Sequence, residues 1–164
     1  MERTKFYDAV RTGLGRLSQD NVNGFETILD EAERQRTPLN NLAYMLATAW
    51  WETAKTMQPV REAFFIAPND FERAERWRKR NLRYYPYYGR GLPQLTWERN
   101  YRKMTEGLRD RFKAKYPDFD LVKNPDQALI PEIAIAIMFE GMLHGYYTGK
   151  ALKDYFTDNK SEWV

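Results

Sequence analysis

The chain has no cysteine and a single histidine, His144, among its 164 residues. The lack of cysteine excludes disulfides and thiolate metal sites. One histidine argues against a histidine-based metal site and against a Ser-His-Asp triad. The groups left for chemistry are carboxylates, hydroxyls and amides, and we expect neither a metal nor another cofactor.

Long apolar runs are also missing. No run is long enough to span a membrane, and the N-terminus, MERTKFYDAV, lacks the apolar core of a signal peptide. We therefore expect synthesis in the cytoplasm and no stable membrane insertion. The formal net charge of +3 favours anionic surfaces only mildly and is weak support for nucleic acid as a partner.

Apolar and aromatic residues are plentiful. They make up 43% and 15% of the chain, as in a folded globular protein. The length suits one domain with a core of its own, and no internal repeat or linker divides residues 1–164. An excess of aromatic side chains is typical of clefts that bind sugars or bases, although most such rings pack in the core.

The stretch Leu42–Ala63 predicts a core helix that carries a carboxylate near its end. Leu39, Leu42 and Leu46 recur at helical spacing and predict a buried stripe. The side that holds Met45, Thr48 and Glu52 is largely apolar as well, so we expect this helix in the middle of the domain. Thr37 is its expected N-cap, with Pro38 at the first helical position.

Glu52 is the residue of that helix that needs an explanation. Pro59 limits the helix, so Glu52 should lie in its last turn, where the helix dipole disfavours negative charge. Partial burial would disfavour the charge again, as a general acid working near neutral pH requires. The alternative is an ion pair with one of the many Arg or Lys side chains, and the spacing alone leaves both open.

Several other segments predict helices. We expect an amphipathic helix within Met1–Arg16, a second one capped by Ser18, a third over Glu98–Tyr116, and an apolar one over Ile133–Leu143 that Pro131 opens and Gly145 ends. The segment Phe64–Arg83 is dense in charge. It suits either a basic patch for phosphate or anionic glycan or a solvated helix with internal ion pairs, and its mixed signs favour the second.

The segment Tyr84–Tyr101, YYPYYGRGLPQLTWERNY, predicts an irregular or short β-like stretch that bends at Gly89 and Gly91. Behind it stand Gln94, Thr96 and Asn100, which both donate and accept hydrogen bonds. Such groups on a rigid loop suit the hydroxyl and N-acetyl groups of sugars. A purely local role would explain one of the three more easily than the whole set.

Two blocks of the sequence, AYMLATAWWETAKTMQPVREA and YYPYYGRGLPQLTWERNY, resemble the signature blocks of glycoside hydrolase family 19, the chitinase class. NPDQAL and FEGMLHGYYTGKALKDYF are similar to that family too. The likeness is strongest to its compact, cysteine-free members from phages and prophages, which act as endolysins on peptidoglycan. The resemblance implies a mainly α, lysozyme-like single domain, with a cleft between the central helix and the Tyr84–Asn100 loop.

The resemblance also implies roles for individual residues. Glu52 falls at the catalytic acid, and Glu62 at the base that activates water. The implied substrate-binding residues all lie in the second block: Tyr88, Arg90, Gln94, Thr96 and Asn100. The family inverts the anomeric centre, which requires the two carboxyl groups to stand roughly 6.5–9.5 Å apart with water between them.

Two features depart from the family pattern. Trp51 precedes Glu52 where the family usually has histidine, and a tryptophan cannot form the same hydrogen bonds. The chain also stops at Ser161-Glu162-Trp163-Val164, where relatives usually continue, so the C-terminal part of the family domain is expected to be absent.

The expected function is therefore hydrolysis of β-1,4 bonds in peptidoglycan by a monomer, which reaches the periplasmic cell wall after release, for example through a holin. Chitin hydrolysis and glycan binding without catalysis are the alternatives, and no nucleic-acid partner is expected.

Overall fold

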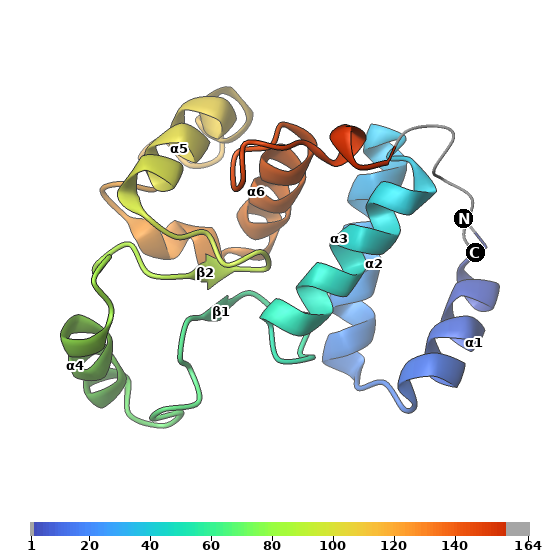
Figure 1. Cartoon of the computed structure of the whole chain (residues 1–164), viewed down its shortest axis with the longest axis horizontal. Helices are drawn as coiled ribbons and strands as arrows, with labels where there is room; N and C mark the ends of the chain where they lie inside the picture. Colours follow the sequence, from blue (N-terminus) through green and yellow to red (C-terminus); the bar gives the residue numbers. More distant parts are fainter. Residues whose placement is uncertain (1, 157–164) are drawn as a thin grey trace.

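The computed structural model describes residues 2–156, and in this part of the chain six α-helices accompany one short β-ribbon (Figure 1). The helices are α1 (Arg3–Leu14), α2 (Gln19–Gln35), α3 (Leu39–Glu52), α4 (Phe71–Asn81), α5 (Glu98–Phe112) and α6 (Pro131–Leu143). The strands are β1 (Val60–Arg61) and β2 (Arg90–Gly91), and two 3-10 turns, η1 (Pro125–Leu129) and η2 (Leu152–Asp154), complete the fold. The expected mainly helical class is confirmed. Met1 and the chain end at Ser161–Val164 lie outside the described residues.

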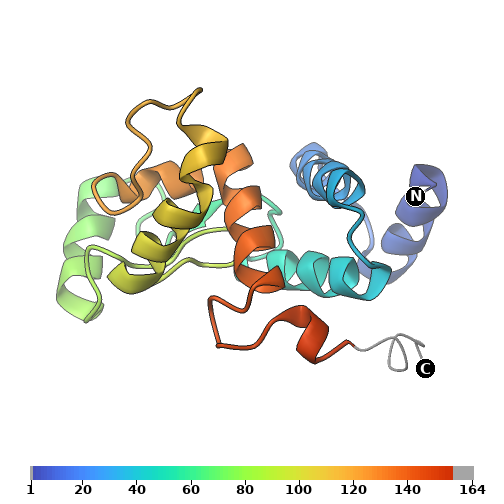
Figure 2. The same ribbon diagram turned by 90° about the horizontal axis from the view of Figure 1, so that it is seen from above.

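Helix α6 lies between two groups of elements, with α1–α3 on one side and α4, the β-ribbon and α5 on the other (Figures 1 and 2). It is apolar on all sides and joins two hydrophobic clusters. Ala134, Ile135, Met138, Phe139 and Met142 pack with α1–α3, whereas Ile133, Ala136 and Ile137 pack with α5. A helix that is apolar all round is stable only when it is buried on all sides. The predicted end of this helix is confirmed, because Gly145 has a φ of 70°.

Helix α3 is not the middle of the domain, contrary to expectation. Leu42, Met45 and Ala49 form its buried stripe, whereas Leu39 is 61% exposed and Tyr44 50% exposed. The physical reason is that α6 takes the central position, so α3 covers it from one side and keeps its other side open. No helix within residues 2–156 is both long and apolar enough to cross a membrane.

The two predicted helix starts have different outcomes. The Ser18 cap is confirmed, since its hydroxyl accepts a hydrogen bond from the Asn21 N–H at 3.1 Å. The Thr37 cap is wrong. Helix α3 begins at Leu39 with the extended Pro38 as its N-cap, and the buried Thr37 hydroxyl has no hydrogen-bond partner among the described residues.

The charged segment forms α4, and the structure supports the interpretation as a helix with internal ion pairs. Asp70 caps it by accepting from the Arg73 N–H at 2.9 Å. Arg76 pairs with Glu72 at 3.5 Å, and the buried Arg78 pairs with Glu75 at 2.7 Å.

The β-ribbon is antiparallel and pairs Val60 with Gly91 and Arg61 with Arg90. The predicted bend at Gly91 is confirmed by its φ of 92°, a backbone conformation that favours glycine. A Cβ at this position would also lie 3.0 Å from the Ala128 carbonyl oxygen. The ribbon is therefore pressed against η1, which fixes the place of its strands.

Glu31 joins the two groups of elements, because the carboxylate on α2 accepts hydrogen bonds from Arg111 on α5 at 2.8 Å and from Arg34 at 2.6 Å. Burial alone would raise the pKa of this carboxyl. The hydrogen bonds from Arg34, Arg111 and Gln35 outweigh that effect and lower the pKa to about 2.

We predict that Glu31→Gln destabilises the protein at neutral pH but hardly at all in acid. The folded-state pKa lies below the ordinary 4.5, so the contribution is present above that pH and disappears as the pH falls through about 2. Urea unfolding should show a loss of about 2 kcal/mol at pH 7, an amount reduced for solvent screening. Glu106→Gln, an exposed carboxylate on α5, is the control. An equal loss for Glu31→Gln at pH 7 and pH 2 would contradict the account.

Candidate active site

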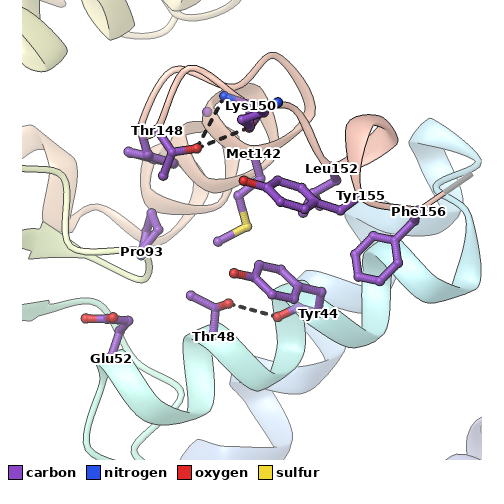
Figure 3. Close-up of a pocket in the computed structure, with 12 residues that line it drawn as sticks. Tyr44, Thr48, Glu52, Pro93, Met142, Thr148, Lys150, Leu152, Tyr155 and Phe156 are labelled. Atoms are coloured by element: carbon purple, nitrogen blue, oxygen red, sulfur yellow. Dashed lines mark hydrogen bonds between the residues drawn. The ribbon is translucent and has the colours of Figure 1, made fainter.

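Glu52 is the last residue of α3 and lines a cavity of about 610 Å³ (Figure 3). One wall is the exposed side of α3. The other wall is formed by the end of α6 and by the segment that follows α6. The lining residues are Tyr44, Thr48, Glu52, Pro93, Gly141, Met142, Tyr147, Thr148, Lys150, Leu152, Tyr155 and Phe156. Tyr44 and Tyr155 lie on opposite walls, and both rings are about half exposed, at 50% and 53%.

The Glu52 carboxylate is open to this cavity, and the partial burial expected for it is wrong. Helix α3 ends at Glu52, and the buried positions of its last turn belong to Ala49 and Thr53, whose hydroxyl donates to the Ala49 carbonyl oxygen at 2.7 Å. Glu52 also makes no ion pair with any residue in the range 2–156. Neither of the two explanations for a core glutamate therefore holds, and the carboxylate is free to meet a ligand.

Trp51, the neighbour of Glu52, does not contribute to this site. Its ring is 73% exposed and does not line the cavity. The Lys55 ammonium lies 5.7 Å from the ring centroid. Trp51 therefore does not shield Glu52 from water.

Glu62, the second predicted carboxylate, follows β1 and is held on both oxygens. The Tyr84 hydroxyl donates to Oε1 at 2.6 Å and the Gly89 N–H donates to Oε2 at 2.8 Å. The backbone of Glu62 is held as well, because its N–H donates to the Gly89 carbonyl at 2.7 Å. Burial and the hydrogen bond to Glu62 raise the pKa of Tyr84 to about 12, so the hydroxyl stays a donor at physiological pH.

Gly89 is needed for close approach rather than for the bend that we expected there. A Cβ at this position would lie 2.4 Å from Gln94 Oε1 and 3.2 Å from Glu62 Oε2. Because Gly89 has no side chain, the amide oxygen of Gln94 and the carboxylate of Glu62 can both lie close to its backbone.

The three polar residues of the second block all donate to nearby backbone. Gln94 Nε2 donates to the Gly91 carbonyl at 3.3 Å, Thr96 to the Gln94 carbonyl at 2.8 Å, and Asn100 to the Thr96 carbonyl at 2.8 Å. The local role therefore holds for the whole set, against our expectation. The amide oxygens of Gln94 and Asn100 have no hydrogen-bond donor within residues 2–156. These two residues can therefore offer acceptors to a ligand.

Tyr88 and Arg90, which were expected to contact substrate, are interior residues instead. They are 1% and 5% exposed. The Tyr88 hydroxyl donates to Glu75 at 2.6 Å, and the Arg90 guanidinium donates to Asp126 at 2.7 Å and stacks on the Tyr88 ring at 3.7 Å from its centroid. Burial alone would raise the pKa of Asp126, but the hydrogen bonds from Arg61 and Arg90 outweigh it and lower that pKa. Both residues hold the turn in place rather than meeting a ligand.

The structure brings together only part of the predicted set. Glu52 shares its cavity with Pro93, and the next residue, Gln94, points toward Gly89 beside Glu62. The turn at Pro93–Gln94 thus connects the surroundings of the two carboxylates, although Glu62 does not line the cavity of Glu52. Asn100 lines a second cavity on α5, of about 370 Å³.

Sequence reasoning missed the aromatic walls of the Glu52 cavity. A usable signal was present on one wall, since Tyr44, Thr48 and Glu52 follow one another at intervals of four and so share a helix face. The opposite wall, with Thr148 and Tyr155, belongs to a distant segment and has no such signal.

Comparison with family models, curated proteins and solved structures gave no match to this chain. Within residues 2–156 no group of three or more His, Asp or Glu side chains is arranged to hold a metal ion. The chemistry of the site is therefore argued from Glu52, Glu62 and their neighbours.

We predict that Arg90→Met lowers the free energy of unfolding by about 3 kcal/mol, because it removes a buried cation from Asp126 and leaves the buried Tyr101 hydroxyl without its donor. Arg61→Met is the matched control. It removes the second, more exposed cation from the same Asp126 carboxylate and should cost about 1 kcal/mol. Urea unfolding of the three proteins measures both. Unchanged stability of Arg90→Met together with weaker glycan binding would contradict the structural role.

Proposed function

We propose that the protein is a glycoside hydrolase with a lysozyme-like fold that cleaves β-1,4 bonds between amino sugars, with bacterial peptidoglycan as its polymer. The observation that carries the proposal is that two carboxylates lie near the Pro93–Gln94 turn, Glu52 in the cavity that Pro93 lines and Glu62 at Gly89 beside Gln94. One of them, Glu52, is open in an aromatic cavity. The other, Glu62, is fixed by two hydrogen-bond donors.

In this proposal Glu52 is the general acid and Glu62 the general base. Glu52 gives its proton to the glycosidic oxygen as the bond from that oxygen to the anomeric carbon breaks. A water molecule adds its oxygen to the anomeric carbon from the opposite face and gives its proton to Glu62. The amide oxygen of Gln94, beside Glu62 at Gly89, can accept a hydrogen bond from that water.

The cavity supports a sugar ligand. The half-exposed rings of Tyr44 and Tyr155 offer apolar faces with a polar edge. From Tyr44 to Glu52 the helix rises about 12 Å, at about 1.5 Å per residue, which gives room for more than one sugar ring beyond the acid. The preference for peptidoglycan over chitin rests on the resemblance to phage endolysins, and the wall is reached after release from the cytoplasm.

A second candidate is glycan binding without catalysis. It is favoured by the exposed position of Glu52 and by Trp51, which is itself exposed and does not line the cavity. Retained binding without product in the assay below would establish it.

The test is release of reducing ends from purified peptidoglycan by the wild type, Glu52→Gln and Glu62→Gln. Each substitution removes an acid or a base and should lower kcat by at least about 100-fold, the usual worth of such a group. Glu106→Gln is the control and should equal the wild type. Full activity of Glu52→Gln would mean that another group is the acid, and cleavage of chitin alone would overturn the choice of polymer.

We also predict that Tyr84→Phe lowers kcat about tenfold with little change in KM, because Glu62 loses one of the two donors that orient it. Tyr85→Phe, an exposed neighbour, is the control. An unchanged kcat, or a loss that appears only as a higher KM, would contradict this positioning role.

A further inference from the structure

A second cavity, the basic cavity, lies between α5 and the segment after α6 and has a volume of about 370 Å³. It is lined by Arg99, Asn100, Lys103, Tyr146, Tyr147, Thr148 and Gly149. Two of these side chains are cationic and none is acidic. The cavity therefore has the charge to receive an anionic group.

The two cations of the basic cavity have no ion-pair partner in the part of the chain that the structure describes. Arg99 and Lys103 are four residues apart on α5 and so share a helix face, where like charges repel. By contrast, Arg102 and Lys113 of the same helix region pair with Glu98 at 2.5 Å and with Asp110 at 2.6 Å. The basic cavity is thus lined by two positive charges that have no counter-ion among residues 2–156.

The basic cavity adjoins the cavity of Glu52. Tyr147 and Thr148 line both of them, so the two spaces meet at this segment. Thr148 lies on the wall that faces Glu52 and α3 in Figure 3. A branched ligand can therefore occupy the Glu52 cavity with one branch and reach the basic cavity with another.

We infer that the basic cavity binds a carboxylate of the substrate while the sugar chain lies in the Glu52 cavity, which makes the protein selective for acidic glycan. This inference rests on the proposed function and identifies the substrate carboxylate as the group that the site recognises. Chitin consists of uncharged N-acetylglucosamine units. Every second sugar of peptidoglycan instead carries a lactyl group, whose carboxyl is either free or joined to a peptide that bears carboxylates of its own.

The chemistry of the cavity fits such a group. The Arg99 guanidinium can bind a carboxylate through two parallel hydrogen bonds, and the Lys103 ammonium adds a second charge. The Asn100 amide oxygen lacks a donor among residues 2–156 and can accept from a peptide N–H of the substrate. The two possible sources, lactyl group and peptide stem, share the carboxylate.

The experiment compares three ligands. They are glycan strands of peptidoglycan with their peptide stems, the same strands after an amidase has removed the stems, and chitin oligosaccharides. Binding is measured by calorimetry in the Glu52→Gln background, which prevents turnover. Arg99→Gln with Lys103→Gln is the test variant. Arg102→Gln with Lys113→Gln removes the same charge from the same helix region outside the basic cavity and is the matched control.

The test variant should bind strands of peptidoglycan about tenfold more weakly, which corresponds to ~1.4 kcal/mol, and chitin oligosaccharides within about twofold of its parent. A loss for stem-bearing strands alone identifies the peptide carboxylate as the source. A loss for stem-free strands alone identifies the lactyl carboxyl, which is free only there, and a loss for both kinds of strand means that the cavity accepts either carboxylate. An equal loss on chitin, an equal loss in the control, or no loss at all would overturn the inference.

The same proteins with Glu52 restored separate this inference from the proposed function. Selective binding without any release of reducing ends would refute the hydrolase and leave the basic cavity as a carboxylate site. Hydrolysis of peptidoglycan that is unchanged in the test variant would refute the basic cavity and leave the hydrolase.

Discussion

The hydrogen bonds of the buried Arg90 guanidinium are the interactions on which the turn of the candidate site depends. It donates to Asp126 on η1, to the carbonyls of Pro86 and Tyr88, and to the Tyr101 hydroxyl on α5. A buried charge is tolerated only when it is paired and hydrogen-bonded on all sides. Arg90 is itself a residue of β2, so its hydrogen bonds to Asp126 and Tyr101 hold the β-ribbon against η1 and α5. Glu62 follows β1 and Gln94 lies shortly after β2, so the ribbon determines the positions of both residues.

Helix α6 supplies the second constraint. It is shared by two hydrophobic clusters, so the N-terminal helices and the α5 side are built on opposite faces of one element. Glu31 and Arg111 add a charged link between the same two sides. The Glu52 cavity forms where α3 and the segment after α6 leave a gap, and the basic cavity forms on the other side of that segment. Both cavities are therefore consequences of how the chain leaves α6.

Local signals in the sequence predicted much of the helical fold. The spacing of Met104, Leu108 and Phe112 predicts α5 and its buried face, because a helix of 3.6 residues per turn places them together. The Ser18 cap was predictable because a cap involves only neighbouring residues. Which of α3 and α6 is the central helix was not predictable from the sequence, since both helices are apolar and only contacts between distant segments decide the matter.

The place of Glu52 in the last turn of α3 was predictable, but the surroundings of the candidate site were not. The family resemblance implied that Tyr88 and Arg90 contact substrate. Their partners Glu75 and Asp126 lie 13 and 36 residues away in the sequence, and no local pattern indicates that they hold these two side chains in the interior. The exposure of the Glu52 side chain also could not be predicted, because it depends on which residues of the last turn of α3 are buried. The local hydrogen bonds of Gln94, Thr96 and Asn100 depend on turn geometry that polarity alone does not specify.

The central claim is that Glu52 and Glu62 act as acid and base on opposite sides of the scissile bond, with a water molecule between them. Such a mechanism inverts the anomeric carbon. The most direct measurement is the proton NMR spectrum of freshly released reducing ends from a β-linked glycan, recorded before mutarotation equilibrates them. The account predicts that the α-anomer appears first. Initial release of the β-anomer would contradict it, because retention requires a covalent intermediate or participation of the substrate itself in place of an activated water.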